Sequence, residues 1–239
     1  MNTFATLSLS ALVLSLLACG GSPSSDAPAN STLSTVALQG IWRSPAGAAS
    51  TLFTTVLPDG KVWALIANAN STRLLKGGFE VQNNSFVGTG KIITLGTTTS
   101  SAASLSASVV EKLSLTGAIT SAGSSEPFSL AYQLRYDTPA TLGDFVGTWR
   151  ATLGPGTVTW TIGAAGELTG TRTTGCTYSG QLSLRAEQKA VLNAVVTEDC
   201  SGVLTKLSGV ALKSEDRQGI SMMLTNSDDT AAVAVNLVK

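Results

Sequence analysis

The residues able to carry out chemistry are few, because the 239-residue chain contains no histidine. Ser-His-Asp and Cys-His catalysis and His-ligated metal hydrolysis are therefore excluded. Three pairs of adjacent acids remain as candidates for carboxylate chemistry: Glu198-Asp199, Glu215-Asp216 and Asp228-Asp229. Neighbours on a strand point to opposite faces, so adjacency does not make a cooperating pair. We interpret these acids as solvated turn charges, with calcium binding around Asn226, Asp228 and Asp229 as the alternative.

The N-terminal segment has the pattern of an export signal. Residues 4–17 form an uncharged, apolar-rich run, which is shorter than the roughly 20 residues of a membrane-spanning helix. The run ends in Leu16, Leu17, Ala18 and Cys19. This ending resembles the lipobox of bacterial lipoproteins, Leu-x-(Ala/Ser/Gly)-Cys. The resemblance covers about the first twenty residues, and residues 1–3 lack the Lys or Arg that the family has there.

The resemblance implies that residues 1–18 are a cleaved signal peptide and that Cys19 becomes the lipidated first residue. Two or three acyl chains such as palmitate, at roughly 0.8 kcal/mol per buried CH₂, make an effectively permanent anchor. Gly20 stands where the family's inner-membrane retention signal usually places Asp, which implies the outer membrane of a Gram-negative envelope. Residues 19–36 are small and polar with two prolines, and we expect a flexible tether there.

The other two cysteines, Cys176 and Cys200, would then be a lone pair in an oxidising compartment. We expect a disulfide, which closes a loop of about 25 residues and contributes roughly 3.5 kcal/mol on the chain-entropy model. Two free thiols are the alternative. Two thiolates without histidine would leave zinc half-coordinated, so no metal site and no other cofactor are expected.

The composition favours a β-rich body. Apolar residues make up 43% of the chain, charged residues only 13%, and the formal net charge is zero, which gives no electrostatic footprint for nucleic acid. Frequent Thr, Ser, Gly and Val with closely spaced turn residues indicate many short strands. We expect an all-β fold of two tandem antiparallel barrels or sandwiches, residues 37–138 and 139–239, with the boundary near residues 138–141.

Internal echoes suggest duplication of one unit. The sequence QGIWR at residues 39–43 returns as VGTWR at residues 146–150, 107 positions later. Residues 55–62 and 161–168 share the pattern of a strand, a glycine turn and a strand. A third echo pairs residues 113–119 with residues 206–212, and its offset of about 92 predicts a shorter middle in the second half. Chance similarity between Thr- and Gly-rich strands is the alternative.

Aromatic residues mark the expected core. Alternation places Val158, Trp160 and Ile162 on one face of a half-buried strand. The Gly-x-Trp that begins each half resembles, in a general way, the entry strand of lipocalin-like barrels, in which the Trp plugs one end. We therefore expect Trp42, Trp149 and Trp160 to be core residues.

These features predict a lipid-anchored envelope protein that binds a partner without catalysis. The partner would be a protein or a small apolar molecule inside a barrel, with the membrane contacted through the lipid anchor. A tether followed by two β-barrels is similar to the plan of factor H binding and transferrin-binding surface lipoproteins, without a motif-level match. A structural or assembly component of the outer membrane is the alternative, and a carboxylate- or Ser/Lys-dependent enzyme is a lesser one. An open barrel mouth would favour a small ligand, and a filled interior would favour protein recognition.

Overall fold

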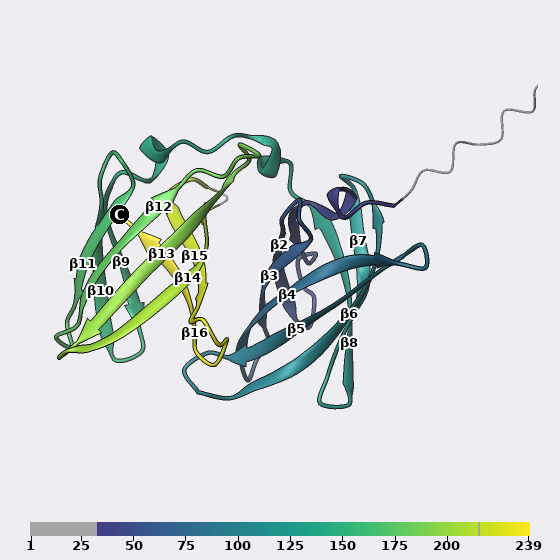
Figure 1. The fold of residues 1–239 in the computed structure, drawn as a ribbon, viewed down its shortest axis with the longest axis horizontal. Helices are drawn as coiled ribbons and strands as arrows, with labels where there is room; N and C mark the ends of the chain where they lie inside the picture. Colours follow the sequence, from purple (N-terminus) through teal and green to yellow (C-terminus); the bar gives the residue numbers. More distant parts are fainter. Residues whose placement is uncertain (1–32, 215) are drawn as a thin grey trace, which may run out of the picture. The chain divides into compact units, whose positions relative to one another are not determined.

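Two closed antiparallel barrels follow one another along the chain (Figure 1). The computed structural model describes residues 33–214 and 216–239. In each barrel, eight strands pair in chain order and the last strand returns to pair with the first. The expected all-β fold of two tandem units is therefore confirmed, with barrels and not sandwiches. The expected signal peptide, Cys19 and the tether as far as residue 32 lie outside the described residues.

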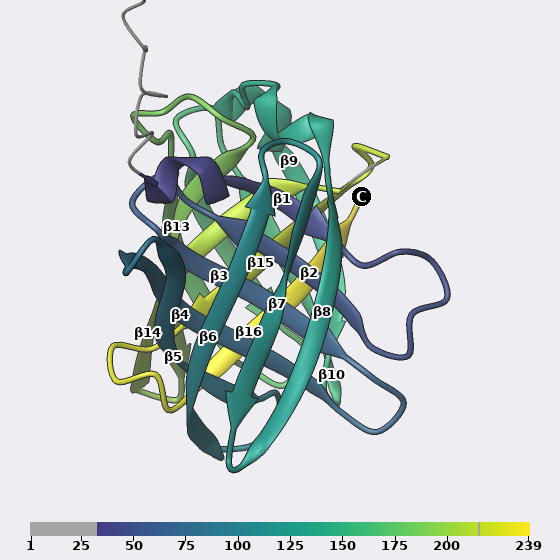
Figure 2. The ribbon, with the colours of Figure 1, turned by 90° about the vertical axis from the view of Figure 1, so that its right-hand side faces the viewer.

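Each barrel is a simple meander, and Figure 2 shows β6, β7 and β8 of the first barrel side by side. The strands of the first barrel are β1 (Gly40–Arg43), β2 (Thr51–Val56), β3 (Lys61–Ala67), β4 (Thr72–Gln82), β5 (Ser85–Thr94), β6 (Ser100–Val110), β7 (Ser114–Ser121) and β8 (Ser124–Tyr132). Those of the second are β9 (Gly147–Leu153), β10 (Gly156–Ile162), β11 (Glu167–Arg172), β12 (Thr177–Ser183), β13 (Val191–Cys200), β14 (Val203–Lys213), β15 (Gly219–Thr225) and β16 (Ala232–Val238). Three short 3₁₀ helices complete the fold: η1 (Thr35–Leu38), η2 (Leu134–Asp137) and η3 (Leu142–Phe145).

One end of each barrel is plugged by a 3₁₀ helix and a tryptophan. The indole Nε1 of Trp42 donates to the carbonyl of Leu38 at 2.9 Å, and that of Trp149 donates to the carbonyl of Phe145 at 2.7 Å. Both rings are fully buried, and Trp160 lies in the core of the second barrel. Because η1 belongs to the plug, residues 35 and 36 of the expected tether are part of the folded body.

The hairpin between the second and third strands of each barrel also follows one design. Gly60 and Gly166 both adopt a positive φ, +81° and +85°, which glycine tolerates and other residues avoid. The carbonyl of Gly60 accepts from the amide of Phe79 at 2.9 Å, and that of Gly166 accepts from Leu182 at 2.8 Å. A side chain at either glycine would collide with the partner strand's carbonyl. The echo between residues 55–62 and 161–168 therefore marks equivalent turns.

Strand registers extend this equivalence around both barrels. One row of register partners crosses four successive strands in each barrel, and the two rows correspond position by position. The row is Thr54, Ala64, Leu75 and Ile92 in the first barrel, and Trp160, Gly170, Tyr178 and Glu198 in the second. Equivalent residues stay 103 to 107 positions apart as far as Leu130 and Leu237.

The third sequence echo and the shorter middle predicted from it are wrong. Residues 113–119 lie mainly in β7, the seventh strand of its barrel, whereas residues 206–212 lie in β14, the sixth strand of the other. Strands that pack against an apolar core all alternate apolar and polar residues, so the sequences of two strands that are not equivalent can still look alike.

The two barrels pack together within one compact unit, residues 33–239. Their outer walls share an apolar cluster made of Ile41, Leu57, Trp63, Leu74 and Tyr136 from the first half and Val191, Val210, Leu212 and Met223 from the second. The linker between η2 and η3 falls at residues 138–141, where the sequence places the boundary.

Asp137, at the end of η2, joins the two halves by polar contacts. Its carboxylate accepts from Lys189 of the second half at 2.8 Å, and from Lys112 and Tyr132 of the first at 3.0 Å each. Lys189 is the largest cause that lowers the pKa of Asp137 from 3.8 to about 2.

We predict that Asp137→Asn lowers the free energy of unfolding at neutral pH by about 1 kcal/mol, once solvent screening is allowed for. A carboxyl with a lowered pKa stabilises the fold above its ordinary pKa of 3.8, and this stabilisation is lost as the pH falls through about 2. Urea unfolding between neutral and acid pH measures it. The variant should lose less stability than the wild type on acidification. Asp59→Asn is the control, because Asp59 pairs with Lys61 inside a single hairpin.

Candidate ligand-binding site

The second barrel is open at the end opposite its plug, and a cavity of about 1070 Å³ begins there. Trp160, Arg172, Tyr178 and Glu198 line it together with apolar side chains such as Val196, Leu207 and Leu224. Two turns of the first barrel, residues 68–72 and 94–97, form part of its wall. The cavity is thus bounded by both halves of the chain.

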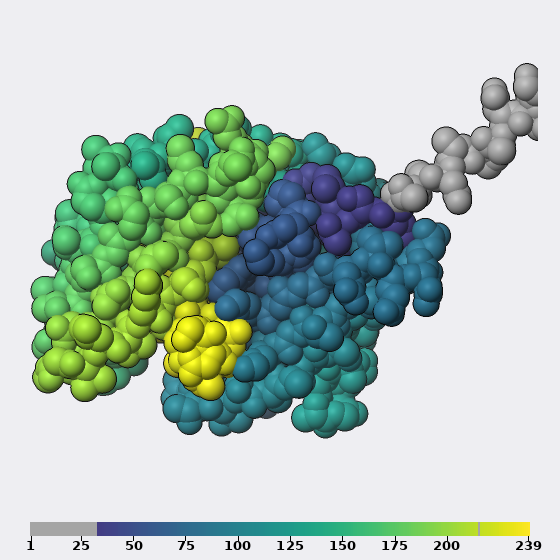
Figure 3. All heavy atoms as spheres, viewed as in Figure 1, coloured from purple at the N-terminus to yellow at the C-terminus, as the bar shows by residue number. Residues whose placement is uncertain are grey.

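The turn between β15 and β16 fixes the first barrel beside this opening. Asp229 pairs with Lys76 at 2.8 Å, and the carbonyl of Asp228 accepts from Lys91 at 2.7 Å. Figure 3 shows this yellow turn lying against the first barrel. Asp228 and Asp229, which the sequence offered as part of an alternative calcium site, therefore make contacts with the first barrel. The side chain of Asn226, the third residue of that site, accepts hydrogen bonds from the amides of Thr230 and Ala231.

The interior of the first barrel contrasts with this cavity. Its cavity measures only about 10 Å³ and is lined almost entirely by aliphatic and phenyl groups. Packing at this density leaves no room for a ligand. The sequence left open whether a barrel would have a filled interior or an open mouth. The first barrel has the filled interior, and the second has the open mouth.

Three polar side chains converge inside the second barrel. The hydroxyl of Tyr178 donates to Glu198 at 2.5 Å, and the Arg172 guanidinium lies 3.8 Å from the same carboxylate oxygen. Arg172 also donates to the carbonyl of Leu153. Burial, reinforced by the neighbouring Glu198 carboxylate, raises the pKa of Tyr178 above its ordinary value, so the hydroxyl remains a donor at neutral pH.

The first barrel shows that the fold does not require these polar groups. The positions equivalent to Tyr178 and Glu198 hold Leu75 and Ile92. Ala64 and Gly170 are equivalent, and Ile66 and Arg172 each lie two residues further along the strand. The residue equivalent to Arg172 is therefore Ile66, which is also aliphatic. Buried ion pairs seldom stabilise a fold more than well-packed apolar residues do. The polar triad, defined as Arg172, Tyr178 and Glu198, therefore points to binding.

Two donors in this cavity have no hydrogen-bond partner among the described residues: the indole N–H of Trp160 and the Nε of Arg172. The Trp160 ring instead makes an edge contact with Tyr178, with 5.3 Å between centroids. Unsatisfied buried donors are costly and uncommon in folded proteins. A ligand that brought an oxygen acceptor to these groups would remove that cost.

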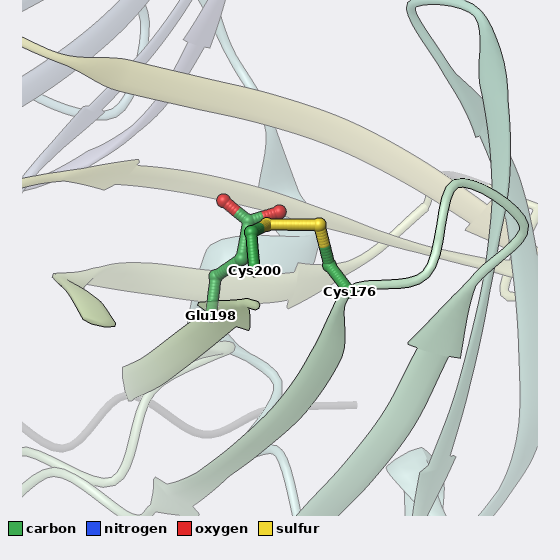
Figure 4. A group of neighbouring side chains, drawn as sticks. All are labelled: Cys176, Glu198 and Cys200. Carbon is green, nitrogen blue, oxygen red and sulfur yellow. A yellow bond between two sulfur atoms is a disulfide. The ribbon is translucent and has the colours of Figure 1, made fainter. Parts of the chain in front are cut away.

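A disulfide between Cys176 and Cys200 lies beside Glu198 of the triad (Figure 4). It ties the segment before β12 to the end of β13, the strand that carries Glu198. Sulfur and carboxylate oxygen atoms of Cys176, Glu198 and Cys200 lie within 4.8 Å of one another. Sulfurs joined in a disulfide are not thiolates, and only thiolates bind metal ions well. We therefore interpret the disulfide as a brace that joins two strand ends at the mouth.

The interpretation of Glu198 as a solvated turn charge is wrong, because its side chain points into the barrel and is only 22% exposed. Asp199 points the other way and accepts from the amide of Gly202 in the next turn. Asp216 likewise accepts from Ser214 and Gln218 in an exposed turn, and Glu215 lies outside the described residues. Arg172 and Tyr178 were missed, although each continues the inward alternation of its strand.

We predict that Cys176→Ser with Cys200→Ser lowers the free energy of unfolding by roughly 3.5 kcal/mol, because the unfolded chain regains the freedom of the closed loop. Urea denaturation measures the loss. A reductant should reproduce it in the wild type and leave the double variant unchanged. A loss well under 1 kcal/mol would contradict the role of the disulfide as a brace.

Among the described residues, no helix is both long and apolar enough to cross a membrane. Comparison with protein-family models, with curated proteins and with solved structures finds no match to this chain.

Proposed function

We propose that this protein is a lipid-anchored envelope protein whose second barrel binds a small amphipathic molecule without transforming it. The observation that carries the proposal is the polar triad in an open cavity, at a level where the first barrel is packed with aliphatic side chains. Its volume of about 1070 Å³ suits a drug-sized or lipid-sized ligand.

The lining describes the ligand. The more exposed apolar lining residues, Leu153, Pro155 and Val233, offer a wall for a hydrocarbon or aromatic body. The triad carries one positive and one negative charge, so the ligand needs no net charge. The unpartnered donors of Trp160 and Arg172 call for an oxygen acceptor, such as a carboxylate, a carbonyl or an amide oxygen.

A protein partner is the second candidate. Val203 and Leu204, at the start of β14 beside the cavity mouth, are each 68% exposed. Exposed aliphatic side chains next to an opening suit a protein contact.

We predict that octanoic acid and octanamide quench or shift tryptophan emission by binding in the cavity, and that octylamine, which offers no oxygen acceptor, binds more weakly. The triple variant Arg172→Ile, Tyr178→Leu, Glu198→Ile installs the residues of the first barrel. It should fold with equal or greater stability and lose about tenfold in affinity, because the polar partners are gone.

Two tryptophan variants provide the matched control. Trp160→Phe should abolish the optical signal, whereas Trp42→Phe removes an equally buried indole from the filled barrel and should preserve it. Equal affinity in the wild type and the folded triple variant would contradict the proposed site. No binding of any probe would favour a protein partner at Val203 and Leu204.

We also predict that protein purified from membranes begins with an acylated Cys19, since the proposed anchor depends on that thiol. Mass spectrometry of the mature N-terminus tests this, and Cys19→Ala should release the protein from the membrane fraction. Protease treatment of intact cells then separates display at the surface from a periplasmic position. An unmodified Cys19 would refute the anchor and leave the barrel site untouched.

A further inference from the structure

A second pocket, independent of the proposed ligand site, lies at the plugged end of the second barrel. Its volume is about 290 Å³, and its walls come from η2, the linker to η3, the turn between β14 and β15, and the last residue of the chain. Its charged lining consists of Arg135, Asp144, Lys213, Arg217 and Lys239. Four cationic side chains thus face one carboxylate.

The carboxylates near this pocket make their hydrogen bonds to uncharged groups and not to the pocket cations. Asp144 accepts from the amide and hydroxyl of Thr141 at 2.8 Å each, and Asp216 accepts from Ser214 and Gln218. Lys213, Arg217 and Lys239 form no ion pair with a carboxylate in the described part of the chain. Arg135 donates to the carbonyl of Lys213 and so helps to hold the pocket wall.

The two lysines lie directly over the plug. The Nζ of Lys213 is 4.3 Å from the ring centre of Trp149, and that of Lys239 is 4.9 Å from it. Burial and the neighbouring charge of Lys239 lower the pKa of Lys213, and they outweigh the opposite effect of Asp144 and Asp216.

The first barrel again serves as an internal reference. Leu130 and Leu237 are equivalent, so Tyr132 stands where the second barrel has Lys239. Ala107 and Ala211 are equivalent as well, so Val109 of the first barrel occupies the position of Lys213 in the second. The first plug closes without either cation, and the lysines are therefore not a requirement of the fold.

Exposed aliphatic side chains lie close in sequence to the residues that line the pocket. Leu134 is 78% exposed, Val238 56% and Val146 37%, and each lies one or two positions from a charged lining residue. Cations flanked by exposed hydrocarbon match a ligand with an anionic head and an apolar tail. The helices η1, η2 and η3 lie along this same side of residues 33–239 (Figure 1).

We propose that this pocket binds the phosphate head group of a membrane lipid. Lys213, Arg217 and Lys239 contact the phosphate oxygens, and Leu134, Val146 and Val238 contact the first part of the acyl chains. Charge-assisted hydrogen bonds to phosphate are among the stronger polar contacts that proteins make.

Native mass spectrometry of the full-length protein in nonionic detergent tests the proposal, with phosphatidic acid, diacylglycerol and glycerol 3-phosphate as probes. We expect a one-to-one adduct with phosphatidic acid, none with diacylglycerol and a weaker one with glycerol 3-phosphate. Lys213→Gln with Lys239→Gln should reduce the phosphatidic acid adduct about tenfold. Lys206→Gln, an exposed cation on β14 near the open end, should not change it.

Further variants keep the result interpretable. Lys213→Arg with Lys239→Arg retains the charge and should retain the adduct, which separates loss of binding from loss of folding. Leu134→Ser should weaken phosphatidic acid and leave glycerol 3-phosphate unchanged. Equal adducts with diacylglycerol, or no effect of the Gln pair, would overturn the phosphate site. Glycerol 3-phosphate binding as tightly as phosphatidic acid would replace the lipid with a soluble phosphate anion.

Discussion

Closing eight strands into a barrel places every second side chain inside, and the identity of those side chains decides what each barrel can do. Both barrels satisfy this constraint with one register, so they differ at equivalent interior positions and not in plan. In the first, Leu75 and Ile92 complete a dry core. In the second, Tyr178 and Glu198 occupy the same level and line a cavity. The first barrel, whose interior is filled, therefore serves as an internal reference for the interior residues of the second.

The two ends of each barrel are unequal for a reason that is local in sequence. A 3₁₀ helix, a glycine and a tryptophan lie within a few residues, and the indole donates back to the helix carbonyl. This satisfies both polar groups without water and closes one end. With one end closed by the plug, the cavity of the second barrel lies at the other end. In the second barrel, turns of the first barrel narrow that end, and Asp229 and Lys76 hold them in place.

Local pattern was enough to predict much of the fold. Composition and alternation indicate short strands, and the glycine turns within residues 55–62 and 161–168 indicate hairpins. The compartment implied by the N-terminus indicates the disulfide between Cys176 and Cys200. Register was not predictable in the same way, because Thr- and Gly-rich strands resemble one another at several offsets. Glu198 was misassigned for a related reason: its adjacent acid suggested a turn, whereas the run Leu192, Ala194 and Val196 sets the parity that points it inward. The pairing of Asp229 with Lys76 joins residues far apart in sequence, and no local pattern encodes it.

The energetics of the triad limit what the cavity can hold. Burial of Arg172 and Glu198 costs several kcal/mol per ion on general grounds, and their mutual attraction with the Tyr178 hydrogen bond offsets much of it. The pair is neutral as a unit, so the ligand does not have to neutralise a net charge. What stays uncompensated is hydrogen-bonding capacity: the donors of Trp160 and Arg172 lack acceptors among the described residues. A ligand gains most by supplying an oxygen there while its apolar body covers Leu153 and Val233. Selectivity in this barrel should thus follow the position of one acceptor along an apolar molecule more than the charge of that molecule.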